Sequence, residues 1–453
     1  MLKDISINLN NFFLSVSDAI DLSSPQISTH QMRVAYLSWL LAKKMKLPLE
    51  RLKQIYIAAL FHDIGALDPS DKLLLHRFEE KDLFRHCLRG ERLFLSIPFL
   101  RPMAPIVRHH HTSWATWQKN GYHIEDPYVL ESQLIYLADL VERLLDRREY
   151  VLHQTNRIIA RIIEAAGQEI HPEVVDIFLD MAKRASCWLD LVSPRLYSIL
   201  LNHGPLERVE IGLEDIAQLA AFFSKIIDFK SRFTSTHSTG VAACATILAH
   251  ICALTEQEVL LMKIAGNLHD LGKLVIPNAI LEKPGPLTPQ EFAIIKQHTY
   301  HTYMILSSIE GFTQIAEWAA FHHEKLDGSG YPFGLTADRL SLGARIMAVA
   351  DIFTALIERR PYRKEMSKKE VTEILKRQAQ KGLLDSYIVK LLLENYQEVY
   401  TKVSEQQQIA QEKFQEYLQL PIVSMAQDNN VPHLPKQPVF LPQGPRWPRD
   451  LHR

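Results

Sequence analysis

The most constraining feature of this 453-residue chain is a long internal repeat. Residues 29–65 align with residues 236–272 at an offset of 207, and residues 137–150 align with residues 349–362 at an offset of 212. The difference indicates one five-residue insertion in the second copy, after its His-Asp pair. A duplication of this length implies two domains of one fold, each long enough to bury a core. We expect a first copy at 1–204, a second copy at 205–402, and a helical extension with a disordered, proline-rich tail at 403–453.

The hydrophobic pattern of both copies is helical. Apolar residues recur at three- and four-residue steps, as in RLKQIYIAALFHD and LLMKIAGNLHDLG, which is the period of an amphipathic helix. Thr255 to Glu258 has the pattern of a capping box, and Pro289 follows Thr288 at a first helical position. No stretch alternates cleanly enough to predict a sheet. We therefore predict an all-α protein built from tandem, duplicated helical bundles.

Composition excludes several classes of protein. Lys and Arg number 51 against 52 Asp and Glu, so there is no broad basic surface of the kind that a nucleic-acid polymer or an anionic membrane requires. No apolar run approaches the ~18–20 residues of a transmembrane helix, and the first residues lack the pattern of a secretory signal. The four cysteines form no CxxC pair. We expect a cytoplasmic protein with no nucleic-acid or membrane partner.

Histidine and aspartate residues recur at fixed spacing in both copies. A single histidine on an apolar helix face is usually structural, but here the steps between the histidines and aspartates match from copy to copy. In the second copy these residues are His237, His269, Asp270, His298, His322, His323 and Asp351. In the first copy they are His30, His62, Asp63, His86, His110, His111 and Asp139. Each lies on or beside an expected helix, and helical bundles build metal sites from such inward-facing side chains.

The donor set indicates two metal ions. Five imidazoles and two carboxylates are too many for a tetrahedral zinc, but they suit two octahedral ions that share a bridging carboxylate. Asp270, between His269 and a glycine turn, is the expected bridge. Two ions about 3.5–4 Å apart activate a hydroxide and clamp the oxygens of a phosphoryl group. We therefore expect a metal-dependent hydrolase of phosphate esters, with iron or manganese as the metal because nitrogen and oxygen donors accept both.

Residues near this set in the sequence fit an anionic substrate. Lys273 follows the His-Asp pair, and Arg360 and Arg363 follow Asp351 at the end of an expected helix. The loop Asp327–Pro332 has glycines, including Gly330, where backbone must approach something closely, and its tyrosine, Tyr331, offers a ring for a base to stack on.

The motifs HDLGK, HHEKLDGSGYP and ADIFTALIERRPYR resemble the HD-GYP family of metal-dependent phosphohydrolases over essentially all of the second copy. The resemblance implies hydrolysis of cyclic di-GMP, a bacterial second messenger, to pGpG, to GMP or to both. It implies that His269, Asp270 and Lys273 are catalytic, and that the seven histidines and aspartates of the second copy bind the metal. Substrate contacts would come from Lys273, Gly330, Tyr331, Arg360 and Arg363. Some relatives bind a third ion through a glutamate, but Phe233 stands at that position, so we expect two ions.

The first copy departs from this pattern outside its ligand set. Ala66 replaces the lysine, Thr112 replaces the glutamate of HHE, Val151 stands where Arg363 does, and SWATWQKNGYH replaces the GYP loop. This resembles a plain HD domain without the dinucleotide pocket. We expect a regulatory domain in which His30, His62, Asp63, His86, His110, His111 and Asp139 form a second candidate metal site.

Three other functions stay open from the sequence. The second copy could hydrolyse another cyclic dinucleotide or a nucleotide, or it could be a non-catalytic signalling scaffold whose loop docks onto a GGDEF-type cyclase. A purely structural helical repeat is disfavoured by the spacing of the His-Asp pairs. The sequence does not determine the oligomeric state.

Overall fold

The computed structural model describes residues 7–21, 28–66, 83–206, 209–229, 236–283, 285–358 and 365–418. The predicted all-α class is confirmed, because the described residues are helical except for turns, loops and one small sheet. That sheet pairs β1 (Ile7–Asn8) with β2 (Glu210–Ile211). The chain divides into two compact units, an N-terminal unit at residues 8–210 and a C-terminal unit at residues 211–419.

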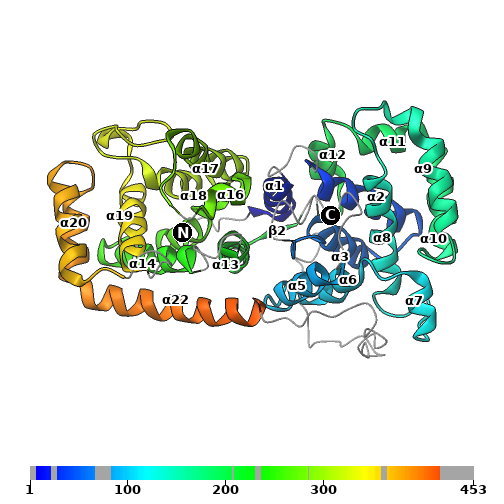
Figure 1. Ribbon diagram of the computed structural model, residues 1–453, viewed down its shortest axis with the longest axis horizontal. Coiled ribbons are helices and arrows are strands. Elements are labelled where there is room, and N and C mark those ends of the chain that lie inside the picture. Colours follow the sequence, from blue (N-terminus) through cyan, green and yellow to red (C-terminus); the bar gives the residue numbers. More distant parts are fainter. Residues whose placement is uncertain are drawn as a thin grey trace, which may run out of the picture. The chain divides into compact units, whose positions relative to one another are not determined.

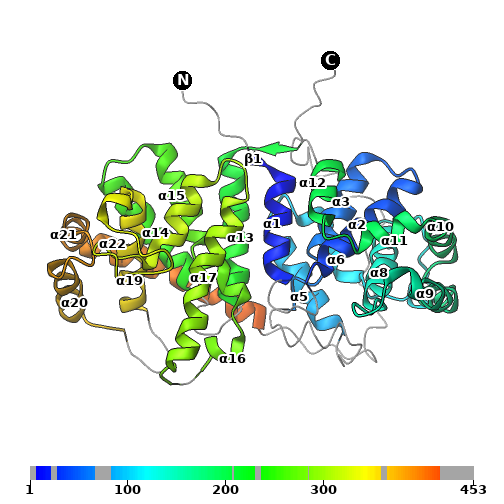
Figure 2. The same cartoon turned by 90° about the horizontal axis from the view of Figure 1, so that it is seen from above.

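The N-terminal unit is a helical bundle (Figure 2). Its elements in chain order are α1 (Leu9–Asp21), α2 (His30–Lys44), α3 (Leu49–Leu60), α5 (Leu83–Leu95), η1 (Arg101–Met103), α6 (Ala104–His109), α7 (Trp114–Lys119), α8 (Val129–Arg143), α9 (Val151–Ala165), α10 (Pro172–Ala182), α11 (Ala185–Leu191) and α12 (Leu196–His203). At its centre α2 packs against α3 and α8.

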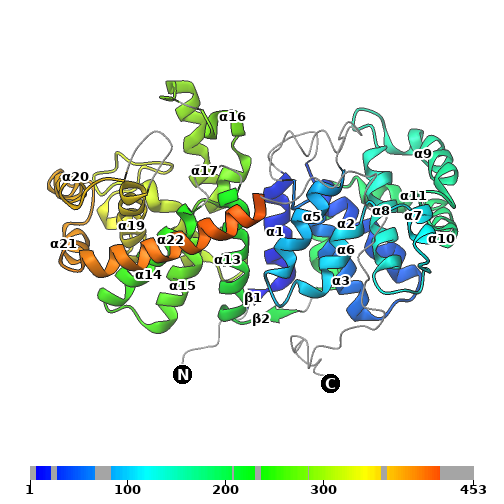
Figure 3. The ribbon, with the colours of Figure 1, turned by 60° about the horizontal axis from the view of Figure 1, so that its bottom comes forward.

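The C-terminal unit repeats this arrangement (Figure 1). Its elements are α13 (Leu213–Phe229), α14 (His237–Ile251), α15 (Glu256–Leu268), η2 (Leu271–Val275), α16 (Asn278–Leu281), α17 (Pro289–Ser307), α18 (Thr313–Ala320), η3 (Phe321–His323), η4 (Ala337–Arg339), α19 (Leu342–Ile357), α20 (Lys368–Gln380), α21 (Ser386–Glu394) and α22 (Tyr396–Leu418). Here α14 packs against α15 and α19, as α2 packs against α3 and α8. The long helix α22 lies along α14 (Figures 1 and 3).

Local sequence explains where the central helices begin. Thr255 and Thr288 cap α15 and α17 through complete capping boxes with Glu258 and Glu291, as their sequences predict. The helices then bury almost purely apolar faces, such as Ile264 and Leu268 of α15 and their neighbours on α14. No helix in the described ranges combines the length and hydrophobicity of a membrane span.

Candidate metal centre

Seven predicted ligand side chains of the C-terminal unit come from separate helices and meet inside the bundle. They lie at the start of α14 (His237), at the end of α15 (His269, Asp270), in α17 (His298), in η3 (His322, His323) and in α19 (Asp351). All except the half-buried His323 are buried. Three groups have donor atoms close enough to share an ion. The first is His237, His269 and Asp351, the second is His298, His322 and His323, and the third is His269, Asp270 and His322.

The carboxylate of Asp270 lies between the first two groups and forms the third with one histidine of each. Its Oδ1 is 3.4 Å from Nε2 of His298 and 3.9 Å from Nε2 of His322. Its Oδ2 is 3.2 Å from Nε2 of His269 and 3.9 Å from Nε2 of His237. One oxygen therefore faces each group, which is the geometry that a bridging carboxylate requires.

The protonation of three histidines fits metal ions. In His269, His298 and His322, Nδ1 lies 2.6–2.8 Å from the carbonyl oxygen of the residue three positions earlier. A carbonyl only accepts, so Nδ1 carries the hydrogen and Nε2 presents a lone pair. Burial lowers the pKa of His298 to about 3 and holds the pKa of His322 well below its usual range, so both rings stay neutral.

These lone pairs are placed where a cation can accept them. The Nε2 atoms of His298 and His322 are 3.3 Å apart, and no hydrogen lies between two lone pairs. Nε2 of His269 and Oδ1 of Asp270 are buried and have no hydrogen-bond partner. Neutral imidazoles oriented by backbone carbonyls around a carboxylate are a normal ligand set for divalent metals. The residues present thus fit the predicted ions.

His237 is held by two carboxylates. Its Nε2 is 3.1 Å from Oδ1 of Asp351, and its Nδ1 is 3.5 Å from Oε2 of Glu358. Thr236 donates a 2.8 Å hydrogen bond to Oε1 of Glu358 and so orients that side chain. Burial lowers the pKa of His237, but Asp351 and Glu358 more than offset this and raise it to about 10. Glu358 is a positioning residue that the sequence did not indicate.

Lys273 and Tyr331 flank the ligands. Nζ of Lys273 is 2.5 Å from Oδ2 of Asp270. The ring of Tyr331 lies 4.9 Å from the ring of His323, and its main-chain N–H donates to the carbonyl of His323. Nζ of Lys296 lies over the Tyr331 ring at 5.4 Å, so the aromatic face has a cation beside it. Lys296 was not indicated by the sequence either.

Glu324 fixes the loop that carries Tyr331. This buried carboxylate accepts hydrogen bonds from the main-chain N–H groups of Phe333 and Leu335, at 2.7 and 3.0 Å. Gly330 lies so close to Glu324 that an added Cβ would be 2.4 Å from its Cα. The glycine is required by this close approach, which agrees with its predicted role in the loop.

Asp228, on α13, orients the helix that begins with His237. Its carboxylate accepts from the main-chain N–H of Ser238 at 3.1 Å and from the Ser238 hydroxyl at 2.6 Å. In the N-terminal unit, Asp21 accepts from the N–H of Gln31 at 2.8 Å. Each aspartate precedes the first ligand histidine by nine residues, at the repeat offset of 207. The repeat was therefore a signal that could have identified both.

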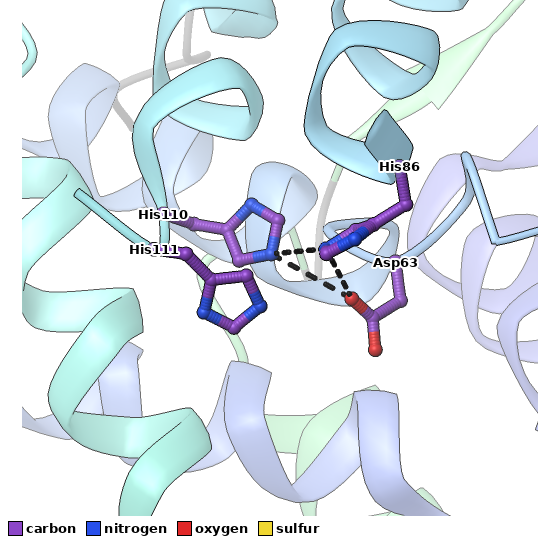
Figure 4. Close-up of side chains that lie close together, drawn as sticks. All are labelled: Asp63, His86, His110 and His111. Carbon is purple, nitrogen blue, oxygen red and sulfur yellow. Dashed lines mark hydrogen bonds and ion pairs between the residues drawn. The ribbon is translucent and has the colours of Figure 1, made fainter. Parts of the chain in front are cut away.

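The N-terminal unit brings its own seven candidate ligands together in the same way. Its donor atoms also fall into two groups, one of His30, His62 and Asp63 and the other of Asp63, His86, His110 and His111. Figure 4 shows the second group, with Oδ1 of Asp63 3.3 Å from Nε2 of His86 and 3.6 Å from Nε2 of His110. The other oxygen of Asp63 lies 3.5 Å from Nε2 of both His30 and His62. Asp139 completes the set, with Oδ1 3.5 Å from Nε2 of His30.

The surroundings of this second set differ. Oε2 of Glu142 is 2.6 Å from Nδ1 of His30, and Nη1 of Arg143 is 3.2 Å from Oδ2 of Asp139. Where the C-terminal unit has its glycine-rich loop, Trp114 and Trp117 pack into a separate apolar cluster. The N-terminal unit thus has a comparable ligand set but no counterpart of the Tyr331 ring that lies beside His323 in the C-terminal unit.

Four of the features named in the sequence analysis fall in parts of the chain that the structure does not describe. Arg360, Arg363 and Phe233, and the proline-rich tail from residue 419, lie outside the described residues.

Comparison with known proteins identifies the family. Models of the HD domain match residues 27–144 and 221–388. The chain is 31% identical over 404 residues to a 3'3'-cGAMP-specific phosphodiesterase 1 of Vibrio cholerae, covering 87% of this chain and 93% of the relative. The chain belongs to the HD superfamily of phosphohydrolases. The resemblance predicted from the HD, HHE and GYP motifs is thereby confirmed.

Two further matches differ in how much of this HD-superfamily protein they cover. The cyclic di-GMP phosphodiesterase response regulator RpfG of Xanthomonas campestris is 40% identical over 152 residues, which is 33% of this chain and 39% of the relative. A crystal structure of a cyclic GMP-AMP specific phosphodiesterase of V. cholerae superposes with a TM-score of 0.60 at 21% identity, covering 87% of this chain and 98% of that chain. The structural match shows that the tandem fold is shared.

Proposed function

We propose that the C-terminal unit is a metal-dependent phosphodiesterase that opens cyclic dinucleotides. The observation that carries the proposal is the position of Asp270, whose Oδ2 faces Nε2 of His269 and whose Oδ1 faces Nε2 of His298, so that one oxygen is directed at each of two groups of candidate ligands. Relatives named as phosphodiesterases of 3'3'-cGAMP and of cyclic di-GMP support the substrate class.

Each residue of the site has a distinct task in this proposal. The seven ligands would hold two divalent cations, which would supply an activated water and neutralise charge on the phosphoryl oxygens. Lys273 adds a fixed positive charge beside Asp270, where charge develops as the phosphodiester is attacked. Tyr331 provides a ring on which a nucleobase stacks, next to His323. No side chain is assigned as the acid for the leaving group.

The substrate within the class is the finer part of the proposal. Cyclic di-GMP, converted to pGpG or GMP, is the substrate that the HD-GYP resemblance implies, and RpfG supports it over part of the chain. The relative that matches 87% of the chain is named for 3'3'-cGAMP, so this hybrid dinucleotide is the second candidate. Both contain guanine, and a direct competition between them decides the preference.

The N-terminal unit is proposed as a regulatory partner with its own metal centre. Nδ1 of His62 and Nδ1 of His110 lie 2.9 and 2.7 Å from backbone carbonyls, so both rings are oriented with Nε2 toward Asp63, as the corresponding rings of the C-terminal unit are toward Asp270. Nε2 of His110 is 3.2 Å from Nε2 of His86, and Oδ1 of Asp63 is buried without a hydrogen-bond partner.

The test is hydrolysis of cyclic dinucleotides by purified protein loaded with Mn²⁺ or, without oxygen, Fe²⁺. An equimolar mixture of cyclic di-GMP and 3'3'-cGAMP is followed by chromatography. Asp270→Ala removes the residue shared by both metal groups and is expected to abolish turnover and reduce bound metal. Asp63→Ala, the matched change in the N-terminal unit, is expected to retain hydrolysis while losing metal from that unit. Full activity in Asp270→Ala would overturn the assignment of the bridge.

The scaffold alternative makes the opposite prediction. A non-catalytic protein that docks onto a GGDEF-type cyclase would bind metal, show no hydrolysis with any metal, and bind that cyclase through the loop around Tyr331. Absence of turnover in protein shown to contain two ions per C-terminal unit would favour this alternative.

A further inference from the structure

We propose that a second ligand site lies behind the metal centre, in a cavity between α13, α14, α15 and α22, and that it binds a small phosphate-bearing molecule of nucleotide size. The cavity has a volume of about 490 Å³, which is in the range of about 300–1,000 Å³ typical of small-molecule sites. None of the seven candidate ligands of the C-terminal unit lines it. The site is therefore distinct from the proposed active site.

The charged groups that line the cavity are mainly cationic. They are four lysines, Lys225, Lys263, Lys402 and Lys413, and one carboxylate, Asp228. Asp228 already accepts two hydrogen bonds from Ser238. In the described part of the chain, Lys263, Lys402 and Lys413 form no ion pair. Four ammonium groups around one cavity favour a ligand with more than one negative charge, which points to phosphate rather than a single carboxylate.

The half-buried Lys225 supports this reading. Its pKa is lowered by burial and by repulsion from Lys413. Two cations that repel each other on facing helices gain stability when an anion binds between them.

The floor of the cavity suits an organic body attached to the phosphate. Ala221, Ala242, Ala243 and Ile247 form an apolar surface of small side chains. Asn267, only 4% exposed, lines the same floor and holds its amide in place by donating to a backbone carbonyl of its own helix. An apolar floor with one fixed amide beneath a ring of cations matches a nucleoside phosphate better than inorganic phosphate.

The repeat shows that the residues of this floor differ between the two units. On α2, which corresponds to α14, the position equivalent to Ala243 is Tyr36, a side chain that is 4% exposed. In the N-terminal unit the Tyr36 side chain itself lines a smaller cavity, of about 330 Å³, so the two units differ in the shape of this face of the helix.

The position of Asp228 connects the cavity to the metal centre. Asp228 lines the cavity and holds the N–H of Ser238, the residue after the candidate ligand His237. A bound phosphate would contact the lysines of the cavity, and the Asp228 carboxylate beside them orients the start of α14. The ligand would therefore act as a regulator of the same unit.

The experiment measures binding of GDP, pyrophosphate and guanosine to the full-length protein by calorimetry in EDTA, which keeps phosphate from metal ions. GDP is expected to bind, pyrophosphate to bind at least about tenfold more weakly, and guanosine not to bind. Because no turnover is involved, failure here is distinct from failure of the proposed phosphodiesterase function.

Two variants locate the site. Lys402→Gln/Lys413→Gln changes two exposed side chains of the cavity and is expected to weaken GDP binding at least about tenfold. The control Lys376→Gln/Lys381→Gln changes two exposed lysines outside the cavity and is expected to leave GDP binding unchanged. Ala243→Tyr fills the floor without changing charge and is expected to abolish GDP binding while pyrophosphate still binds. The proposal is overturned if GDP does not bind the wild type, or if both cavity variants bind GDP as the wild type does.

Discussion

Replacing Gly272 by alanine tests whether the metal centre depends on one close backbone contact. An added Cβ at Gly272 would lie 1.9 Å from the carbonyl oxygen of His298 and 2.8 Å from the main-chain nitrogen of Thr302. Real Cβ atoms essentially never approach other atoms within 3.0 Å, so the start of η2 and α17 must separate by about 1 Å. Metal–ligand distances tolerate deviations of only about 0.2 Å, and a misplacement of about 1 Å costs on the order of 100-fold in rate.

We therefore expect Gly272→Ala to remain helical, to lose metal from the group that contains His298, and to lower kcat/KM about 100-fold. The assay combines circular dichroism, metal analysis of the purified protein and the hydrolysis of cyclic dinucleotides. Gly285→Ala is the matched control, since no atom lies within 4 Å of the added Cβ. Gly65→Ala places the same clash in the N-terminal unit, where the contact with the His86 carbonyl is 2.0 Å, and is expected to spare hydrolysis. A Gly272→Ala protein with full metal content and activity within threefold of wild type would refute the reasoning.

Three further predictions follow from other contacts. Burial raises the pKa of Asp228 to about 7 from 3.8, so the folded protein binds this proton more tightly and this carboxyl lowers stability as pH rises toward 7. Between pH 5.5 and 8 the unfolding free energy of the metal-free wild type should fall by about 2 kcal/mol relative to that of Asp228→Asn, because about 1.5 pH units lie below the pKa at about 1.4 kcal/mol each. Urea denaturation measures this difference, and an equal dependence of unfolding free energy on pH in the two proteins would contradict it. Glu324→Gln leaves one acceptor oxygen for two main-chain donors, so the loop that carries Tyr331 shifts. KM should rise about tenfold with kcat less affected, as measured by steady-state kinetics, and an unchanged KM would show that Glu324 does not position the loop. Lys273→Met should lower kcat about 100-fold with both ions retained by metal analysis, whereas loss of metal instead would make Lys273 a structural residue.

The fold and the ligand set were largely accessible from the sequence because both depend on local periodicity and on the repeat. Helical spacing of apolar residues reports directly which face of a helix is buried, and the equal spacing of histidines in two copies indicated one shared interior point. The structure accordingly brings all seven side chains of each copy together.

The supporting residues were less accessible, and the reason differs from case to case. Glu358 and Glu142 each orient the first ligand histidine of their unit, but they do not occupy equivalent positions in the repeat, so alignment of the copies cannot identify them. Asp21 and Asp228 do share the repeat offset and could have been found. The cavity beneath α22 depends on how a helix outside the repeat packs on α14, and spacing alone carries no information about that packing.

In each unit the candidate ligands come from several separate helices, and this has a consequence for how the protein resists degradation in the cell. An ion held by His237, His269 and Asp351 would tie three helices together as a removable cross-link, and it would do so only in the native arrangement. Metal supply would then govern how long the protein survives proteolysis as well as how fast it works. The same argument applies to the N-terminal unit, which has a full ligand set but no counterpart of the Tyr331 loop. The side chains around Asp63 would then serve to stabilise the bundle.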